Sequence, residues 1–573
     1  MYTGIGASAG IGIGSAVIVK EPSLAYDNKA VSDVDAEKKR LAEALDKCIA
    51  KTQAMADDMK ERVGEKEAEI LEGHVLLLMD PEMTGQMETS IADDKMCAEA
   101  AVEKICDYYM QMFSSIDDEM FQQRATDVCD IKTRLLKILL DVEDVDLANV
   151  PEGTVLVAED LTPSMTAGIN PKNVTGILTE VGGKTSHSAI LARALEIPAV
   201  LSIPGITEKI SNGDKVVLDG SEGQTYINPD EKLQAEYEQK RVAYLEEKAA
   251  LAQFVGRETK TADGVKVELC ANIGKPEDAL KVVECDGEGI GLFRTEFLFM
   301  DRPQIPTEEE QFEEYKKAAV LTKGMPLTIR TLDIGGDKDI PYMGLTKETN
   351  PFLGYRAIRF CLDRVDIFTT QLRAILRASA YGSIRIMIPM ITSVNEVRQV
   401  KDMIKKICSD LDHNGISYDK NIQTGVMIET PAAAIMADAI AQEVDFFSIG
   451  TNDLTQYTIA VDRCNENVAY LYSAFNPAVL RLIRRIIECA HNAGIEAGMC
   501  GEAAANALMA PILLSFGLDE FSVSTGKVLE TRKTIADWSL KEAGLVTDKV
   551  MSMATEKEVT DYLSDYLSER NKK

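Results

Sequence analysis

The chain is organised around one stretch, Gly182-Gly183-Lys184-Thr185-Ser186-His187-Ser188-Ala189-Ile190-Leu191-Ala192-Arg193. The apolar, β-branched run at 174–181 is typical of a strand, and the apolar positions at 190–197 have the spacing of a short buried helix. His187 is therefore expected where a strand passes through a glycine turn into a helix N-terminus. Backbone N–H groups and the positive end of the helix dipole favour an anion at such a place. An imidazole there could accept a phosphoryl group, although a lone histidine is more often structural.

Composition narrows the class of protein. The chain has 573 residues, enough for three or four domains, and 45% of them are apolar. Its 11 cysteines stand singly, which predicts neither a disulfide framework nor a zinc site and favours a reducing cytoplasm. We expect no secretory leader and no membrane span. The net charge of −31 argues against nucleic acid or an anionic membrane as a partner, and favours a basic protein or none.

About half of that charge lies in residues 21–150, which hold 15 basic and 31 acidic residues. Apolar residues recur there at helical spacing, so we predict a helical bundle over residues 21–143. Any one acidic run is most simply a solvated helix face. As a whole domain beside a reactive histidine, however, the bundle is a candidate docking surface for a basic partner. Glu65, Glu67 and Glu69 are the positions we would test first.

The bundle interrupts a predicted α/β domain formed by residues 1–20 and 144–230. Strand patterns recur at 15–19, 153–157, 174–181, 199–202 and 215–219. Thr166 lies in a turn that enters a helix and is a candidate hydrogen-bond partner for His187, although the pattern alone fits a helix cap. Residues 231–261 are predicted to be a linker, mostly one long amphipathic helix.

Strand and helix patterns then alternate eight times over residues 262–573. The strands are predicted at 265–271, 289–293, 326–330, 384–389, 424–428, 446–449, 496–499 and 520–523. Eight such units predict a (β/α)8 TIM barrel, whose chemistry lies at the carboxyl ends of the strands. The predicted fold class is therefore multidomain α/β.

Arginines follow several of these strands. Arg294, Arg330 and Arg463, together with an asparagine, suit a small anion that carries phosphate and carboxylate groups. Any one of them could equally be a surface ion-pair residue. Several at one barrel mouth would repel one another without an anion, so their convergence predicts a binding site.

Other strand ends carry acidic and thiol groups. Glu429 and Asp453 follow neighbouring strands, and two carboxylates with room for water suit Mg²⁺. Cys500 is either a small buried apolar residue or, beside Gly501 and Glu502, a proton donor.

Five blocks, in order along nearly the whole chain, carry a family resemblance. They are residues 182–190, 333–338, 350–356, 445–456 and 498–502. These blocks resemble enzyme I of the bacterial sugar phosphotransferase system, the phosphoenolpyruvate–protein phosphotransferases. The resemblance implies that His187 takes the phosphoryl group of phosphoenolpyruvate and passes it to a histidine of the phosphocarrier protein HPr, releasing pyruvate, as the first step of sugar uptake.

The resemblance also implies residue roles. His187 would be the phosphoryl acceptor, Cys500 the proton donor to the leaving enolate, and Thr166 the hydrogen-bond partner of the active histidine. The helical insertion would bind HPr, and the barrel would bind phosphoenolpyruvate and form a homodimer. The implied ligands are Arg294, Arg330, Arg356, Asn452 and Arg463 for the substrate, and Glu429 and Asp453 for Mg²⁺.

Three alternatives are weaker. Pyruvate phosphate dikinase and phosphoenolpyruvate synthase share the phosphohistidine and barrel parts but need an ATP-grasp domain of several hundred residues. A paralogue in nitrogen regulation would usually carry an extra N-terminal sensory domain. A non-catalytic acidic adaptor would leave the arginines at the barrel mouth unexplained.

Overall fold

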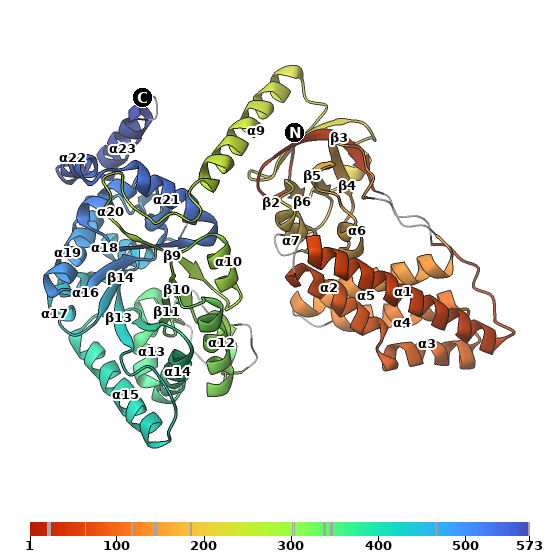
Figure 1. Cartoon of the computed structure of the whole chain (residues 1–573), viewed down its shortest axis with the longest axis horizontal. Helices are drawn as coiled ribbons and strands as arrows, with labels where there is room; N and C mark the ends of the chain where they lie inside the picture. The colour runs from red at the N-terminus through yellow and green to blue at the C-terminus, as the bar shows by residue number, and fades with distance from the viewer. Residues whose placement is uncertain are drawn as a thin grey trace. The chain divides into compact units, whose positions relative to one another are not determined.

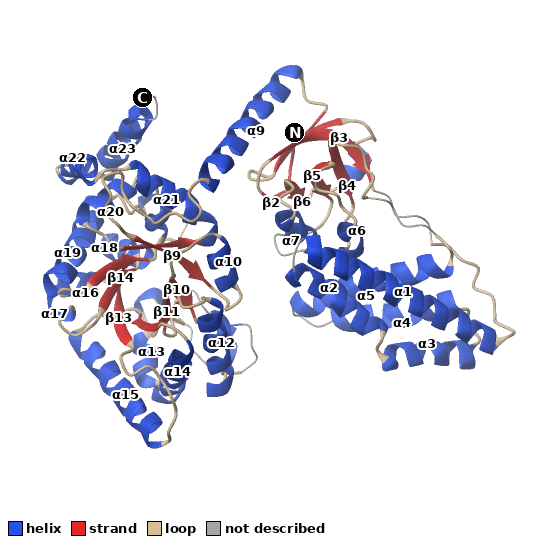
Figure 2. Ribbon diagram, viewed as in Figure 1, coloured by secondary structure: helices blue, strands red, loops and turns tan. Residues whose placement is uncertain are grey.

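The computed structural model describes residues 1–19, 24–62, 65–115, 119–142, 147–183, 186–300, 302, 304–335, 340–343, 348–465 and 467–570. It contains two compact units, Met1–Lys248 and Ala249–Lys573. Each combines helices with strands, as predicted for an α/β protein (Figures 1 and 2). The described part of the chain has no helix that is long and apolar enough to cross a membrane. The predicted limits of the four domains stay predictions.

The first unit contains an eight-stranded sheet in the order β1-β8-β7-β3-β4-β5-β6-β2. The neighbours from β3 to β6 run parallel, and the flanking pairs are antiparallel. The strands are β1 (Tyr2–Thr3), β2 (Ile5–Ser8), β3 (Ile11–Ile18), β4 (Thr154–Ala158), β5 (Val174–Thr179), β6 (Ala199–Leu201), β7 (Lys215–Asp219) and β8 (Gln224–Ile227). We did not predict β1, β2 and β8, because two to four residues are too few to show an alternating pattern.

The helical bundle lies between β3 and β4 in sequence, as predicted. It consists of α1 (Val34–Arg62), α2 (Glu65–Leu78), α3 (Pro81–Asp94), α4 (Ala98–Ser114) and α5 (Glu119–Leu139). We missed α3, although its start is encoded locally. The Asp80 carboxylate accepts the backbone N–H groups of Glu82 and Met83, and Pro81 occupies the first turn.

The strand, turn and helix around His187 are confirmed. β5 leads through glycines into α7 (His187–Ala194), and the Ser186 hydroxyl caps the helix by accepting the Ala189 N–H. The helix is shorter than its apolar spacing suggested, because Glu196 adopts a left-handed φ of 55°. The side chains of His187 and Thr166, and all of Lys184 and Thr185, lie outside the described residues.

Three further helices complete the first unit and lead out of it. They are α6 (Pro163–Ala167), α8 (Ile206–Lys209) and α9 (Glu231–Ala252). The predicted linker helix is therefore present as α9.

The second unit is a closed barrel in which β9 to β16 follow one another in order and every neighbouring pair is parallel. All eight predicted strands are found. They are β9 (Glu268–Ile273), β10 (Ile290–Arg294), β11 (Leu327–Arg330), β12 (Ile384–Ile388), β13 (Gln423–Ile428), β14 (Phe446–Ile449), β15 (Glu496–Met499) and β16 (Glu520–Ser524). This is the topology of a TIM barrel.

Helices surround the barrel strands (Figure 2). They are α10 (Asp278–Glu284), α11 (Phe297–Met300), α12 (Glu308–Leu321), α13 (Ile358–Asp363), α14 (Val365–Ala378), α15 (Val394–His413), α16 (Pro431–Ile435), α17 (Ala437–Ile440), α18 (Thr451–Ile459), α19 (Pro477–Ala493), α20 (Ala510–Phe516), α21 (Val528–Asp537), α22 (Leu540–Met551) and α23 (Glu556–Arg570). Short 3-10 turns include η2 (Pro351–Leu353), η5 (Glu502–Ala505) and η6 (Thr525–Lys527). The helix predicted over 503–514 is broken into η5 and α20, because Asn506 is extended and Pro511 begins a new helix.

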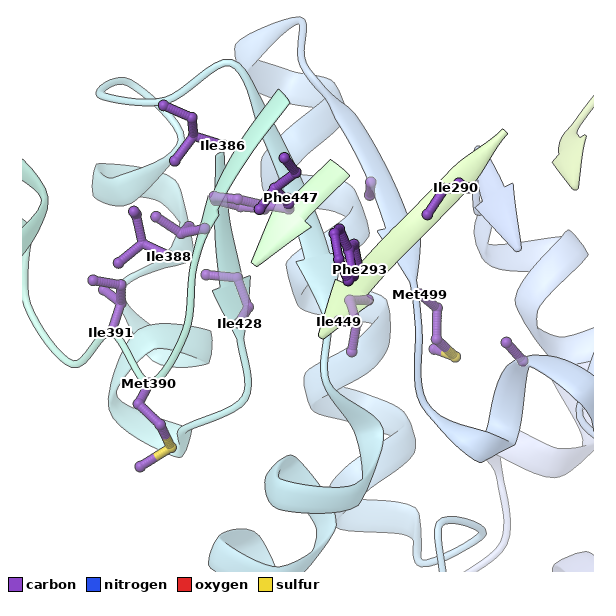
Figure 3. Close-up of a cluster of buried hydrophobic side chains, with 14 of the residues drawn as sticks. Ile290, Phe293, Ile386, Ile388, Met390, Ile391, Ile428, Phe447, Ile449 and Met499 are labelled. Carbon is purple, nitrogen blue, oxygen red and sulfur yellow. The ribbon is translucent and has the colours of Figure 1, made fainter. Parts of the chain in front are cut away.

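The barrel packs on both faces of its strands. One large cluster includes Phe447 and Ile449 together with side chains of the surrounding helices, and Figure 3 shows part of it. Because side chains alternate along a strand, Phe446 faces the other way. It belongs to a separate buried cluster with Leu292, Met387, Met427 and Cys500. Cys500 thus lies at the end of the strands, on the barrel interior.

Candidate active site

The carboxyl ends of four barrel strands line a cavity of about 550 Å³. Asn272 is the penultimate residue of β9, Arg294 ends β10, Cys500 follows β15, and Ser524 ends β16. The Arg294 side chain is exposed to this space. The cavity therefore opens at the end of the barrel where the sequence predicted the site.

Arg330 is the last residue of β11 and is buried. Its guanidinium pairs with Glu296, and its Nη1 lies 3.3 Å from Oδ2 of Asp333. Burial alone would lower its pKa, but the carboxylates of Glu296 and Asp333 raise it above the ordinary value. The buried Nε has no hydrogen-bond partner among the described residues, so one donor remains for an anion.

Arg356 lies just after η2 and is also buried. Its Nη2 donates to Oδ1 of Asp333 at 3.0 Å and to Oδ2 of Asp453 at 3.4 Å, and its Nη1 donates to the Tyr457 hydroxyl at 3.2 Å. Burial opposes the charge on Arg356, but the two carboxylates more than offset it and raise the pKa. Asp333 thereby joins Arg356 to Arg330 in one buried ionic network.

Glu429 follows β13 directly, and its Oε1 accepts the Met390 N–H at 2.6 Å. Burial raises the pKa of Glu429, and the nearby Asp453 and Asp333 carboxylates raise it further. Oδ1 of Asp453 is buried and has no hydrogen-bond partner within the described parts of the chain. Since buried negative charge is costly without a counterion, this pair of carboxylates is a suitable place for a divalent cation.

Asn452 and Arg463 both lie close to Tyr472. The Tyr472 hydroxyl donates to the backbone carbonyl of Asn452 at 3.2 Å. Burial raises the pKa of Tyr472, and the Arg463 guanidinium opposes that rise, so the cation is close to the ring hydroxyl. The backbone N–H of Arg463 donates to Oε1 of Gln456 on α18 at 3.1 Å.

The Cys500 side chain is 5% exposed and lines the cavity. Burial raises the pKa of its thiol to about 11, even though Ser448 and Arg330 act in the opposite direction. The thiol therefore stays protonated near neutral pH and retains a proton to donate.

The predicted site residues fall into two groups. The structure brings the substrate, metal and thiol candidates together at the barrel mouth. His187 and Thr166 belong to the other unit, on α7 and α6, and their side chains lie outside the described residues.

Two residues of this region were missed by the sequence analysis. The Tyr457 hydroxyl on α18 accepts from Nη1 of Arg356 and donates to the backbone carbonyl of Phe352, and only the folded loops reveal these contacts. Lys527 lies in η6 and lines the cavity. It follows β16, which with β12 is one of the two barrel strands after which we predicted no site residue.

A second acidic group lies at the opposite end of the barrel. The side-chain oxygen and sulfur atoms of Glu268, Cys270 and Glu520 that could bind a metal lie within 4.8 Å of one another. These residues stand at or near the beginning of β9 and β16. Arg385 reaches Glu520 and Glu496 there, at 3.3 Å each. Both acidic groups therefore lie beside a guanidinium, but among the described residues Asp453 keeps a buried carboxylate oxygen without a hydrogen-bond partner, which favours the pair at the barrel mouth as the cation site.

Comparison with known proteins places the whole chain in one family. Residues 3–124, 150–223 and 248–540 match the families described as PEP-utilising enzyme, N-terminal; PEP-utilising enzyme, mobile domain; and PEP-utilising enzyme, PEP-binding domain. Relatives named phosphoenolpyruvate-protein phosphotransferase, from Bacillus sp. (strain S) and Bacillus subtilis (strain 168), are 47% and 46% identical. Each match covers 98% of this chain, and 97% and 99% of the respective relatives.

A solved structure described as Enzyme I (nEIt) is 36% identical over 43% of this chain and 99% of its own, with a TM-score of 0.39. The family rests on the relatives that match nearly the whole chain and on the three matched regions. The chain belongs to the family of phosphoenolpyruvate–protein phosphotransferases.

Proposed function

We propose that this enzyme transfers the phosphoryl group of phosphoenolpyruvate to His187, and from there to a histidine of the phosphocarrier HPr, with release of pyruvate. The observation that carries this proposal is the buried network at the barrel mouth, in which two guanidinium groups and several carboxylates adjoin a cavity. Phosphoryl transfer depends mainly on positioning and charge compensation. A fixed, water-poor set of cations supplies both.

The substrate is held by charge and by hydrogen bonds. Arg330 and Arg356 are held by their carboxylates, Arg294 lines the cavity, and Arg463 lies beside Tyr472. Together with the Asn452 amide they suit the phosphate and carboxylate of phosphoenolpyruvate. Substituted one at a time, the four arginines and Asn452 should each weaken substrate binding.

We propose Glu429 and Asp453 as the ligands of a Mg²⁺ ion. The orphaned Oδ1 of Asp453 and the raised pKa of Glu429 both fit oxygen ligands that await a cation. When bound, the ion would neutralise charge on the transferred phosphoryl group.

Cys500 is the proposed proton donor. As the P–O bond of the substrate breaks and an N–P bond forms on His187, the enolate of pyruvate is left. Its methylene carbon takes the thiol proton of Cys500 and becomes the methyl group of pyruvate, and solvent later returns a proton to the thiolate. Thr166 is proposed to hydrogen-bond the active histidine.

The bundle is the proposed HPr surface. Glu69 on α2 is exposed, while the side chains of Glu65 and Glu67 lie outside the described residues. Burial and the nearby Glu82 and Asp80 carboxylates raise the pKa of Tyr109, which places the start of α3 close to α4. Large apolar side chains are exposed on the same helices or at their ends: Leu76, Met79, Tyr108 and Met112. Exposed apolar side chains on an acidic domain suit a small basic protein as partner.

The remaining parts of the proposal follow from the family. We propose a cytoplasmic enzyme that dimerises through its barrel. The relatives that match this chain over 97% and 99% of their own length are named phosphoenolpyruvate-protein phosphotransferase, so the dikinase alternative is not favoured.

Incubation of the full chain with ³²P-labelled phosphoenolpyruvate and Mg²⁺ tests the proposal. We expect one acid-labile, base-stable label on the wild-type protein and none on His187→Ala, which should still bind phosphoenolpyruvate. Label that persists on His187→Ala would remove this residue from the mechanism. A requirement for nucleotide would favour the dikinase alternative.

A further inference from the structure

A buried polar network links three helices of the bundle around His74. His74 on α2 is fully buried, and its Nε2 lies 3.1 Å from Oδ1 of Asp127 on α5. Its Nδ1 lies 2.8 Å from Nη2 of Arg134, also on α5. Arg134 in turn donates from Nη1 to the hydroxyl of Thr52 on α1 at 2.6 Å. Each of these side chains is at least nine-tenths buried.

The chemistry of the groups fixes the direction of these bonds. A guanidinium only donates, so Nδ1 of His74 accepts from Arg134. Nε2 therefore carries the ring proton and donates it to Asp127. The imidazole is held from both sides, and it keeps Arg134 oriented toward Asp130, whose Oδ2 lies 3.6 Å from Nε of Arg134.

Asp130 reaches out of the bundle to α6. Its Oδ1 accepts the Ser164 hydroxyl at 2.6 Å, and its Oδ2 accepts the Ser164 backbone N–H at 3.3 Å. The first N–H groups of a helix have no partner within the helix. A carboxylate from another helix thus caps the start of α6, and it is 2% exposed.

α6 contacts both the bundle and the helix that begins at His187. Its neighbours are α1, α2 and α5 of the bundle, and α7. α7 itself is fastened to the bundle, because Leu191 is buried in a cluster with Ala56 and Met59 of α1 and Ala68 and Leu71 of α2. Movement of α6 against the bundle would therefore displace residues next to the start of α7.

We propose that Asp130 is a positioning residue for phosphoryl transfer. Held by Arg134, and through it by His74, its carboxylate fixes the α6 turn beside His187 and sets the orientation of that imidazole. The inference rests on the proposed function, in which His187 is the acceptor. It gives the docking bundle a second role, since the bundle also holds the reactive turn in place.

Ser164→Ala removes one hydroxyl from this link and leaves the buried network intact. We expect kcat for labelling by phosphoenolpyruvate to fall about tenfold, because a loosely held acceptor spends less time aligned. KM for phosphoenolpyruvate should stay within about twofold, because the barrel cavity is untouched. Ser164→Thr keeps a hydroxyl and should restore most of the rate. Asp130→Asn replaces one carboxylate oxygen by an amide NH2 group, which can no longer accept from the Ser164 hydroxyl or N–H. This variant should lower kcat at least as far.

Thr175→Ala is the matched control. It removes a hydroxyl whose bond, to the Thr154 carbonyl at 3.2 Å, lies at the start of β5, the end of that strand away from His187. Its melting temperature should fall about as much as that of Ser164→Ala, while its kcat stays at the wild-type value. A fall in kcat shared by both variants would mean that the effect is only one of stability.

NMR of the ring nitrogens, in protein labelled with ¹⁵N-histidine, reports directly on the surroundings of the His187 imidazole. The chain has 4 histidines, so each imidazole can be assigned by substitution. Ser164→Ala should shift the His187 ring signals and leave those of His413 and His491 in place. Wild-type kcat with unmoved His187 signals would overturn the proposal. Absence of label on the wild-type protein would instead refute the proposed function, and the NMR comparison would still decide whether Ser164 orients the ring.

Discussion

Asp333 accepts from two buried guanidinium groups, and that arrangement shows what the sequence could and could not predict at the scale of single residues. Arg330 and Glu429 were located because parallel strands of a closed barrel all end at one mouth. Arg356 lies in a loop after η2, so only the family resemblance pointed to it. Its pairing with Asp333 depends on how that loop folds over the barrel, which no local pattern encodes.

Removal of the Cys500 thiol should separate phosphoryl transfer from pyruvate formation. In Cys500→Ala we expect His187 to take label in the first turnover, and pyruvate to form about 100-fold more slowly, because general-acid catalysis is lost. Burial raises the pKa of this thiol to about 11, so the proton-dependent step should be flat from pH 7 to 9 in the wild type and decline only as the pH approaches 11. Rapid quench, with label and pyruvate measured in parallel, checks both. A decline centred near pH 8.5 would show an unperturbed thiol.

Substitutions at the two acidic groups of the barrel should differ in their effect on the Mg²⁺ dependence of labelling. Glu429→Gln and Asp453→Asn should each raise the half-saturating Mg²⁺ concentration at least about tenfold, since each removes a charged oxygen ligand. Glu268→Gln, in the acidic group at the opposite end, is the control and should leave it unchanged. Titration of the labelling rate with Mg²⁺ measures all three. The assignment fails if Glu268→Gln raises the Mg²⁺ requirement and the other two do not.

Helix α2 shows how one element serves two surfaces. Its inner side buries Leu71, His74 and Leu78, whereas Leu76 is 71% exposed. Apolar spacing predicted only its second half, residues 71–79, because its first turns are polar. The inward histidine was not predicted to matter, since its partners come from α5 and from α1, far away in sequence.

Substitutions on the outer side of α2 should impair transfer to the carrier alone. Glu69→Lys should slow phosphorylation of HPr several-fold because it repels a basic partner, and Leu76→Ser should do so by removing an apolar anchor. Labelling of His187 by phosphoenolpyruvate should be unchanged in both. Glu222→Lys, an exposed site on the sheet of the same unit, makes an identical change of charge and should leave both steps intact. Equal slowing by Glu69→Lys and Glu222→Lys would attribute the effect to net charge and not to a docking surface.

At the scale of the whole molecule, the order of helical and strand patterns was the most predictable feature, while the limits of the domains stay predictions. The bundle inserted in the first sheet, then α9, then the barrel each have a distinct pattern, and these patterns divide the chain. Charge adds to this division, because residues 21–150 carry 31 acidic side chains against 15 basic ones, in a chain of net charge −31. What could not be predicted are contacts between distant segments within a unit, such as that of Asp130 with Ser164.

The uneven charge predicts that salt will separate the two half-reactions. Transfer to a basic carrier should be steered by the field of the bundle, and the Debye length shrinks from about 10 Å at 0.1 M salt to about 3 Å at 1 M. The rate constant for HPr phosphorylation should therefore fall steeply with ionic strength. Labelling by phosphoenolpyruvate should respond much less, because its arginines and carboxylates are mostly buried and paired with one another. Stopped-flow measurements at 0.05 to 1 M salt give the rate constants of both steps. Glu69→Lys should weaken the salt dependence of HPr phosphorylation and leave that of labelling by phosphoenolpyruvate as it is. Glu222→Lys should change neither. Parallel slopes for the two half-reactions would mean that the bundle does not steer the carrier.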